Sequence, residues 1–276
     1  MREPAEILTH RLDGGGDTIL LLNGGFMTFA TWEPVVSHLS GSHQLLFCDL
    51  RGQILSPGAS HADLDGNVRD VEALLDHLGL EQVHVLGTSF GAFVGVRLAA
   101  KRPERVLSMI AATATDIASP DMVRGVADLR RVLADIDAGG DPGLFHDLLV
   151  KDVYSLEFVA SYRDALGARR SQMGQLPKTW FAGLDGILTC TENLDLQSDL
   201  GKVRCPTLVV IAGRDEVIPP HQSRAMAAAI PQAQLVEHPT SGHALVAEDP
   251  QWLGLQVQTF LQGIAARSTP APCKQS

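Results

Sequence analysis

Short apolar runs alternate with amphipathic stretches along the first half of the chain. Continuous apolar runs of this length are typical of strands that are buried on both faces of a parallel sheet. The runs that predict strands are 18–23, 44–50, 83–89 and 106–115. The stretches between them predict helices over 31–40, 67–79 and 91–103. This rhythm predicts an α/β fold, with a mostly parallel sheet flanked by helices on both faces.

The rhythm stops near Asp116 and resumes with a strand over 207–213. A helix around 220–230, a strand over 233–238 and a last helix around 250–265 complete the alternation. Between about residues 119 and 200 the pattern is helical and contains no convincing strand. We therefore expect a helical insertion before the 207–213 strand, over the carboxyl ends of the strands, where open α/β sheets bind ligands.

These patterns divide the chain into a core and a helical cap. The predicted divisions are 1–118 for the first part of the core, 119–200 for the cap, 201–267 for the second part of the core and 268–276 for a flexible tail. The tail is polar and contains proline, as expected of a chain end that does not pack.

The segment Gly87-Thr88-Ser89-Phe90-Gly91 lies where a predicted strand meets a predicted helix. It matches the pattern G-x-S-x-G, which marks a nucleophilic serine when it stands at a strand-to-helix turn. Small residues on both sides let the backbone double back, so that the serine hydroxyl projects above the sheet beside a helix N-terminus. The alternative is a glycine packing turn with an incidental serine. The position in the alternation favours Ser89 as a nucleophile.

A serine hydroxyl reacts at neutral pH when a base accepts its proton and a carboxylate orients that base. Asp215 follows the predicted strand over 207–213, and His243 follows the strand over 233–238. All three side chains therefore stand at the carboxyl ends of strands, in the order Ser, Asp, His. This arrangement predicts a catalytic triad.

Each partner of Ser89 has an alternative interpretation. Asp215 could be a solvated loop acid or could cap the helix that follows it. Asp116, after the strand predicted over 106–115, is a rival triad acid without a turn signature around it. His243 is one of 10 histidines, and most of the others have surface patterns. The shared order and position favour Asp215 and His243.

Acyl transfer also needs hydrogen-bond donors for the developing oxyanion. The backbone N–H of Phe90, directly after the nucleophile, is one candidate. Gly25, in the glycine pair after the 18–23 strand, is the other, because glycines let the backbone approach a substrate oxygen. The alternative is a simple glycine turn. The triple 14–16 lacks nucleotide-loop spacing and predicts a β-turn.

Composition narrows the classes of function. The net charge of −10 lacks the basic field that nucleic acid or an anionic membrane attracts. No run approaches the length of a membrane span, and no secretory signal is apparent. No zinc pair, flavin signature or Walker lysine appears, so we expect no cofactor and no metal. The cysteines are far apart and predict reduced thiols in a cytoplasmic protein: Cys48, Cys190, Cys205 and Cys273.

At this point the chain resembles the α/β-hydrolase superfamily, over about residues 17–265. The pieces that carry the resemblance are LLLNGGF, FCDLRGQILS, HVLGTSFGAFVGVRLAAKRPERV, PTLVVIAGRDEVIPP and PTSGHALVAEDP. The resemblance implies Ser89 as nucleophile, Asp215 as orienting acid and His243 as general base. It also implies Gly25 and Phe90 as the oxyanion donors.

Two departures from the family pattern stand close to this site. Asn23-Gly24 occurs where relatives usually have His-Gly. The segment Asp49-Leu50-Arg51-Gly52-Gln53-Ile54-Leu55-Ser56 lacks the second glycine of the pattern D-x-R-G-x-G-x-S, and we expect that loop to be restricted.

The sequence therefore predicts a serine hydrolase that cleaves a carboxylic ester or lactone through an acyl-enzyme, with a small apolar substrate as its partner. An acyltransferase, a thioesterase or a non-catalytic ligand receptor on the same fold remains an alternative. Apolar residues of the insertion and of the oxyanion loop are predicted to line a pocket above Ser89, unless they only pack the cap. They are Phe26, Met27, Phe29, Phe145 and Trp180.

Overall fold

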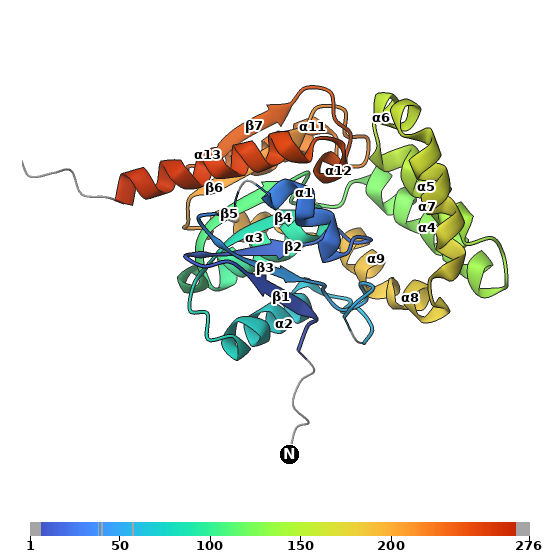
Figure 1. Ribbon diagram of the computed structural model, residues 1–276, viewed down its shortest axis with the longest axis horizontal. Helices are drawn as coiled ribbons and strands as arrows, with labels where there is room; N and C mark the ends of the chain where they lie inside the picture. The colour runs from blue at the N-terminus through green and yellow to red at the C-terminus, as the bar shows by residue number, and fades with distance from the viewer. Residues whose placement is uncertain (1–6, 38, 40, 57, 269–276) are drawn as a thin grey trace, which may run out of the picture.

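A seven-stranded sheet forms the centre of the molecule (Figure 1). The computed structural model describes residues 7–37, 39, 41–56 and 58–268. The strand order is β1-β3-β2-β4-β5-β6-β7; β1 is antiparallel to β3, and every other pair is parallel. The strands are β1 (His10–Asp13), β2 (Thr18–Leu22), β3 (Gln44–Cys48), β4 (Val83–Thr88), β5 (Val106–Ala112), β6 (Thr207–Ala212) and β7 (Gln234–His238).

Helices cover both faces of the sheet, as the sequence predicts (Figure 1). Along β2, Leu20 and Leu22 join the hydrophobic cluster on one face, and Ile19 and Leu21 join the cluster on the other, so the strand is buried on both sides. The first cluster packs against α2 (Leu64–His77), α3 (Phe90–Lys101), α10 (Gln197–Leu200) and α11 (Pro220–Ala229). The second packs against α1 (Glu33–Val36), α12 (Leu245–Glu248) and α13 (Pro250–Ser268).

Some elements are shorter than the sequence predicts. The helix expected over 31–40 is a 3₁₀ turn, Phe29–Trp32, followed by the four residues of α1. β5 ends at Ala112 because Thr113 adopts a left-handed backbone, with φ of 48°. Another 3₁₀ turn, Pro103–Arg105, separates α3 from β5. The edge strand β1 was not predicted, because it has four residues and only half of its positions are shielded.

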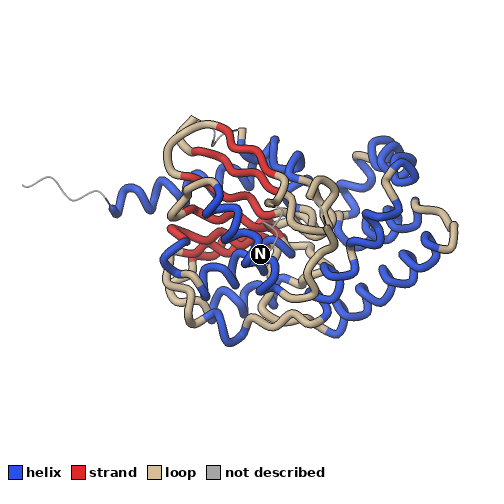
Figure 2. Tube along the Cα trace, turned by 90° about the horizontal axis from the view of Figure 1, so that it is seen from below, coloured by secondary structure: helices blue, strands red, loops and turns tan. Residues whose placement is uncertain are grey.

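The 119–200 region is helical and lies beside one end of the sheet, as Figures 1 and 2 show. Its two ends meet in an isolated antiparallel bridge between Ile117 and Asp195. This single bridge is not a strand, so it agrees with the helical prediction. We call α4 to α9 the inserted helices. They are α4 (Pro120–Asp137), α5 (Gly143–Val153), α6 (Leu156–Ser161), α7 (Arg163–Gln172), α8 (Lys178–Gly183) and α9 (Asp185–Glu192), with a 3₁₀ turn at Met173–Gln175.

Three features complete the description of the chain. None of the helices within the described residues combines the length and the apolar character that crossing a bilayer requires. Cys48, Cys190 and Cys205 are free thiols. Cys273 and the tail predicted over 268–276 lie outside the described residues, except for Ser268, which ends α13.

Two positions at the junction of β4 and α3 require glycine, because other backbone atoms lie very close to them. A Cβ atom built on Gly91 would lie 2.2 Å from the carbonyl oxygen of Leu22. One built on Gly87 would lie 2.6 Å from the carbonyl carbon of Gly91. Both distances are far below van der Waals contact, and the atoms involved belong to backbone that cannot rotate away. The two glycines of the G-x-S-x-G motif are therefore steric requirements.

We predict that Gly91→Ala lowers the free energy of unfolding by about 3 kcal/mol, because the added methyl group forces the start of α3 away from the end of β2. Urea denaturation, with the slope of the transition unchanged, measures this loss. The matched control is Gly125→Ala in α4, where an added Cβ meets no atom within 4 Å. That variant should gain about 0.5–1 kcal/mol through helix propensity. A wild-type denaturation midpoint for Gly91→Ala would contradict the steric argument.

Candidate active site

Ser89 occupies the turn between β4 and α3 in an uncommon backbone conformation, with φ of 49° and ψ of −120°. Neighbouring backbone groups hold this geometry: Ser89 N–H donates to Ala112 O at 2.9 Å, and the N–H groups of Ala92 and Phe93 donate to Ser89 O at 2.9 and 3.1 Å. The side chain makes no capping hydrogen bond to α3. The half-buried hydroxyl is therefore available to another partner.

That partner is His243, on the loop after β7. Its Nε2 lies 3.0 Å from Ser89 Oγ, and its Nδ1 lies 2.8 Å from Asp215 Oδ2. An ionised carboxylate only accepts hydrogen bonds, so Nδ1 carries the proton and Nε2 is left as the acceptor for the serine hydroxyl. The structure thus joins the three residues of the predicted triad in one chain of hydrogen bonds.

Asp215 is fixed by its own loop as well as by His243. Its Oδ1 accepts hydrogen bonds from the backbone N–H groups of Val217 and Ile218, at 2.9 and 2.7 Å. The residue is buried, with an exposed fraction of 5%. Asp215 is therefore neither solvated nor the cap of α11, whose N-cap is Pro219 and has no side-chain hydrogen bond. One of its oxygens organises the turn while the other faces the imidazole. The rival, Asp116, follows β5, where its carbonyl oxygen accepts from Leu196 N–H.

The two expected oxyanion donors lie beside the nucleophile. Phe90 is the first residue of α3, and an atom built at the Cβ position of Gly25 would lie 3.9 Å from Phe90 Cβ. The same position would lie 3.0 Å from Ile187 Cγ2 of α9, so an inserted helix closes over the glycine turn. Within the described residues, the backbone N–H groups of Gly25 and Phe90 have no hydrogen-bond acceptor.

Buried polar side chains support the turn that carries Gly25. Asn23 Nδ2 donates to Asp49 Oδ1 at 2.9 Å and to Gln53 Oε1 at 3.1 Å. Burial raises the pKa of Asp49, and hydrogen bonds from Leu55 N–H, Phe29 N–H and Asn23 oppose that rise. The Asn-Gly departure from the family pattern is thus part of a network with the 49–56 segment.

The five residues predicted to line a pocket fall into two groups. Phe26, Phe145 and Trp180 form an aromatic cluster, in which Phe145 meets the other two rings edge-on at 5.3 and 5.8 Å. Phe145 is fully buried. Met27 packs against the other hydrophobic cluster. Phe29 joins that cluster too and lies 6.2 Å from the Phe47 ring. A pocket surface shared by all five residues therefore stays a prediction.

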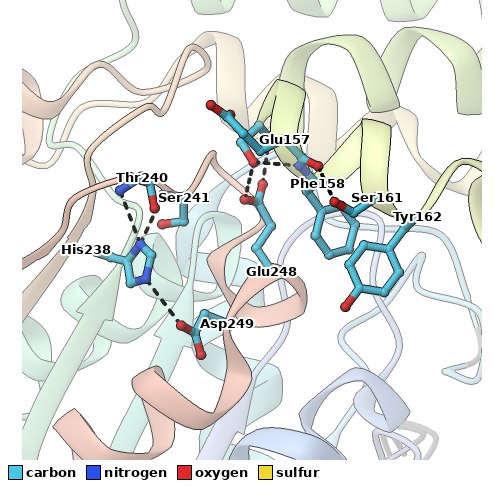
Figure 3. A pocket seen from close by; sticks show the side chains of 10 residues that line it. Glu157, Phe158, Ser161, Tyr162, His238, Thr240, Ser241, Glu248 and Asp249 are labelled. Atoms are coloured by element: carbon cyan, nitrogen blue, oxygen red, sulfur yellow. Dashed lines mark hydrogen bonds and ion pairs between the residues drawn. The ribbon is translucent and has the colours of Figure 1, made fainter.

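The inserted helices hold the loop of His243 (Figure 3). Glu248 accepts hydrogen bonds from Ser155 N–H and Ser155 Oγ, at 2.7 and 2.6 Å, and from Gly242 N–H at 3.2 Å. Ala244 N–H donates to Val153 O at 2.8 Å. Both neighbours of His243 are therefore tied to the segment between α5 and α6. Sequence reasoning missed Glu248, because no local pattern marks a contact across 93 residues.

A surface pocket of about 350 Å³ opens at the same junction, and its lining residues do not include Ser89, Asp215 or His243. The aromatic rings of Phe158 on α6 and of Tyr162, which follows that helix, line one side, and His238 and Asp249 line the other (Figure 3). Phe158 stacks on Tyr162 with ring centroids 4.3 Å apart.

Comparisons with known proteins agree with this geometry. The family model described as alpha/beta hydrolase fold matches residues 17–250. A relative from Pseudomonas savastanoi pv. phaseolicola, named "Putative carbamate hydrolase RutD", is 28% identical over 247 residues, which are 87% of this chain and 92% of the relative. A protein of the same name from a Caulobacter species is 28% identical over 274 residues, covering 94% and 97% of the two chains.

Solved structures share the fold over nearly the whole chain. An alpha/beta hydrolase enzyme from a Medee basin deep-sea metagenome library has a TM-score of 0.86 and 24% identity, with 97% of each chain covered. The enol-lactonase from Burkholderia xenovorans has a TM-score of 0.79 and 23% identity, with 92% of this chain and 96% of that chain covered. The chain belongs to the alpha/beta hydrolase fold family.

Proposed function

We propose that the protein is a serine hydrolase that cleaves an acyl compound through an acyl-enzyme intermediate. The observation that carries the proposal is the hydrogen-bond chain from Ser89 Oγ through His243 to Asp215 Oδ2, with steps of 3.0 and 2.8 Å. This is the arrangement that activates a serine hydroxyl for attack on a carbonyl carbon.

In the first half of the reaction, His243 Nε2 takes the hydroxyl proton as Ser89 Oγ bonds to the substrate carbonyl carbon. The carbonyl oxygen becomes an oxyanion, and the N–H groups of Gly25 and Phe90 donate hydrogen bonds to it. His243 then gives its proton to the leaving group, and the bond to that group breaks. In the second half, a water molecule loses a proton to His243 and attacks the acyl-enzyme, and the proton returns to Ser89 as the acid leaves.

Asp215 stabilises the imidazolium that forms in each half of the cycle. Its second oxygen, held by two backbone N–H groups, keeps the carboxylate from rotating away from Nδ1. Haloalkane dehalogenase or epoxide hydrolase chemistry on this fold would need a carboxylate at position 89, so the serine argues against both.

For the substrate, we propose an uncharged carboxylic ester or lactone. The aromatic rings of Phe26, Phe145 and Trp180 near the glycine turn favour an apolar acyl or alcohol group. A carbamate is the second candidate, because the relatives named above are carbamate hydrolases by name and a carbamate presents the same kind of carbonyl. A panel of p-nitrophenyl esters of graded length, lactones, carbamates and acyl thioesters distinguishes these classes and also tests the thioesterase alternative.

Replacing a triad residue should abolish turnover without unfolding the protein. We predict that Ser89→Ala and His243→Ala each lower kcat by about 10⁴-fold or more, because each removes a group that acts in the transition state. Asp215→Asn should be nearly as severe, since an amide can favour the wrong imidazole tautomer. Steady-state kinetics on the best substrate of the panel, with circular dichroism for folding, measures these effects.

Asp116→Asn is the matched control for the acid, because it makes the same change on the rival aspartate. It should retain wild-type kcat within about threefold. More than a tenth of wild-type activity in Ser89→Ala or His243→Ala would remove the triad assignment. A larger loss in Asp116→Asn than in Asp215→Asn would mean that Asp215 is the wrong acid.

The aromatic cluster gives a separate prediction about substrate size. If Trp180 contacts the acyl chain, Trp180→Ala should shift the preferred ester length by one or more methylenes, each of which contributes about 0.8 kcal/mol. Phe145→Ala tests packing, because its ring is fully buried and its loss should lower stability by about 3–5 kcal/mol. A chain-length series with thermal denaturation measures both. An unchanged length preference in both variants would assign the cluster to packing alone.

A further inference from the structure

We infer that Gln53 is a positioning residue that aims the oxyanion donor at Gly25. The inference rests on the proposed function and deepens it, because it concerns how the donor is held. The contact that motivates it is a hydrogen bond from Gln53 Nε2 to Gly24 O at 2.8 Å.

The accepting carbonyl belongs to the same peptide unit as the Gly25 N–H. A trans peptide is planar, and its C=O and N–H point in opposite directions. A donor that fixes the direction of the Gly24 carbonyl therefore fixes the direction of the Gly25 N–H. Met27 N–H also donates to Gly24 O, at 3.2 Å, and closes the turn from within. Gln53 adds a restraint from a different segment of the chain.

The orientation of the Gln53 amide follows from its other partners. Leu50 N–H donates to Oε1 at 2.7 Å, and Asn23 Nδ2 donates to the same atom at 3.1 Å. Two donors on one atom identify it as the oxygen, so the nitrogen faces the Gly24 carbonyl.

The orientation of the Asn23 amide follows in the same way, from a partner that can only donate hydrogen bonds. Trp32 Nε1, which can only donate, lies 2.8 Å from Asn23 Oδ1. Asp49 Oδ1 accepts a hydrogen bond from the amide nitrogen of Asn23. A chain of hydrogen bonds thus runs from the Trp32 indole through the amides of Asn23 and Gln53 to the peptide between Gly24 and Gly25. This chain fixes the direction of the Gly25 N–H.

Burial makes this restraint persistent. Asn23 and Asp49 have no exposed surface, and Gln53 has 2%. Water therefore does not compete for these hydrogen bonds, and a hydrogen bond accepted by the Gly24 carbonyl polarises the peptide and strengthens its N–H as a donor. Gln53 acts through Gly24, so the expected effect is on the stability of the oxyanion and not on substrate capture.

The test uses two substitutions in the full chain. Gln53→Glu keeps an acceptor oxygen and removes the Nε2 donor, and Gln53→Met keeps similar volume without polar groups. We expect kcat to fall about 10- to 100-fold with KM changed less than about threefold, because removal of an entire oxyanion donor costs about 10²–10³-fold. The matched control is Gln82→Glu, which removes a hydrogen bond from Gln82 Nε2 to Glu104 O, also 2.8 Å long. That variant should keep wild-type kcat.

Inhibition by phenylboronic acid provides a readout that a merely structural role would not move. The boronate adduct of Ser89 carries a tetrahedral, negatively charged centre, so its inhibition constant should rise by the same factor by which kcat/KM falls. The pH dependence of kcat/KM should keep the wild-type midpoint, because Gln53 contacts neither His243 nor Asp215.

The outcomes separate this inference from the proposed function. A folded Gln53→Glu variant with kcat and boronate inhibition within twofold of wild type would overturn the positioning role and leave the hydrolase intact. If that variant does not fold, Gln53→Met decides by the same criteria, with thermal denaturation to confirm folding. A wild-type protein that hydrolyses none of the panel and is not inhibited by phenylboronic acid would overturn both.

Discussion

The close approach of the β4–α3 turn to the end of β2 is the constraint on which the rest of this structure depends. It leaves no room for a side chain at Gly91, and the turn itself leaves none at Gly87. Ser89 in this turn lies in a sparsely populated backbone region, which costs about 1–3 kcal/mol. Burial of β4 and α3 in the main hydrophobic cluster offsets that cost. The same geometry leaves the serine hydroxyl without a capping hydrogen bond to α3 and brings the glycine turn after β2 beside Phe90, the first residue of that helix.

The rest of the site is assembled around that turn from distant parts of the chain. Asp215 and His243 come from the loops after β6 and β7, where parallel strands end at the same edge of the sheet. Glu248 and Ser155 connect the His243 loop to the inserted helices, and Ile187 covers the glycine turn. The insertion therefore helps to position His243 and also covers part of the candidate site.

The fold and the three candidate triad residues could be predicted because their signals are local. Buried strands read as continuous apolar runs, and the tight turn requires its glycines within a five-residue motif. The antiparallel strand β1 gave no such signal, since four half-exposed residues at a sheet edge carry little periodicity. The sequence pattern does not tell toward which face of the sheet an apolar residue near a site turns, and here Met27 and Phe29 pack with one cluster while Phe26 packs with the other.

The supporting residues were beyond sequence reasoning for a different reason. Gln53 and Asn23 are polar residues in loops, and hydropathy alone would place them on the surface. Their burial is stabilised by hydrogen bonds, and the one that joins them connects segments 30 residues apart, which no periodicity records. The departure at Asn23 was visible in the sequence, but its partner became identifiable only in three dimensions.

The central claim is that Ser89 is the activated nucleophile, and covalent labelling tests it most directly. A fluorophosphonate reacts with a serine whose hydroxyl is deprotonated by a neighbouring base, and the adduct survives proteolysis for peptide mass spectrometry. The account predicts a single adduct on the peptide that contains Ser89, formed by the native protein and not formed when the protein is unfolded in urea before the probe is added. No adduct, or an adduct on another residue while Ser89 stays unmodified, would contradict it.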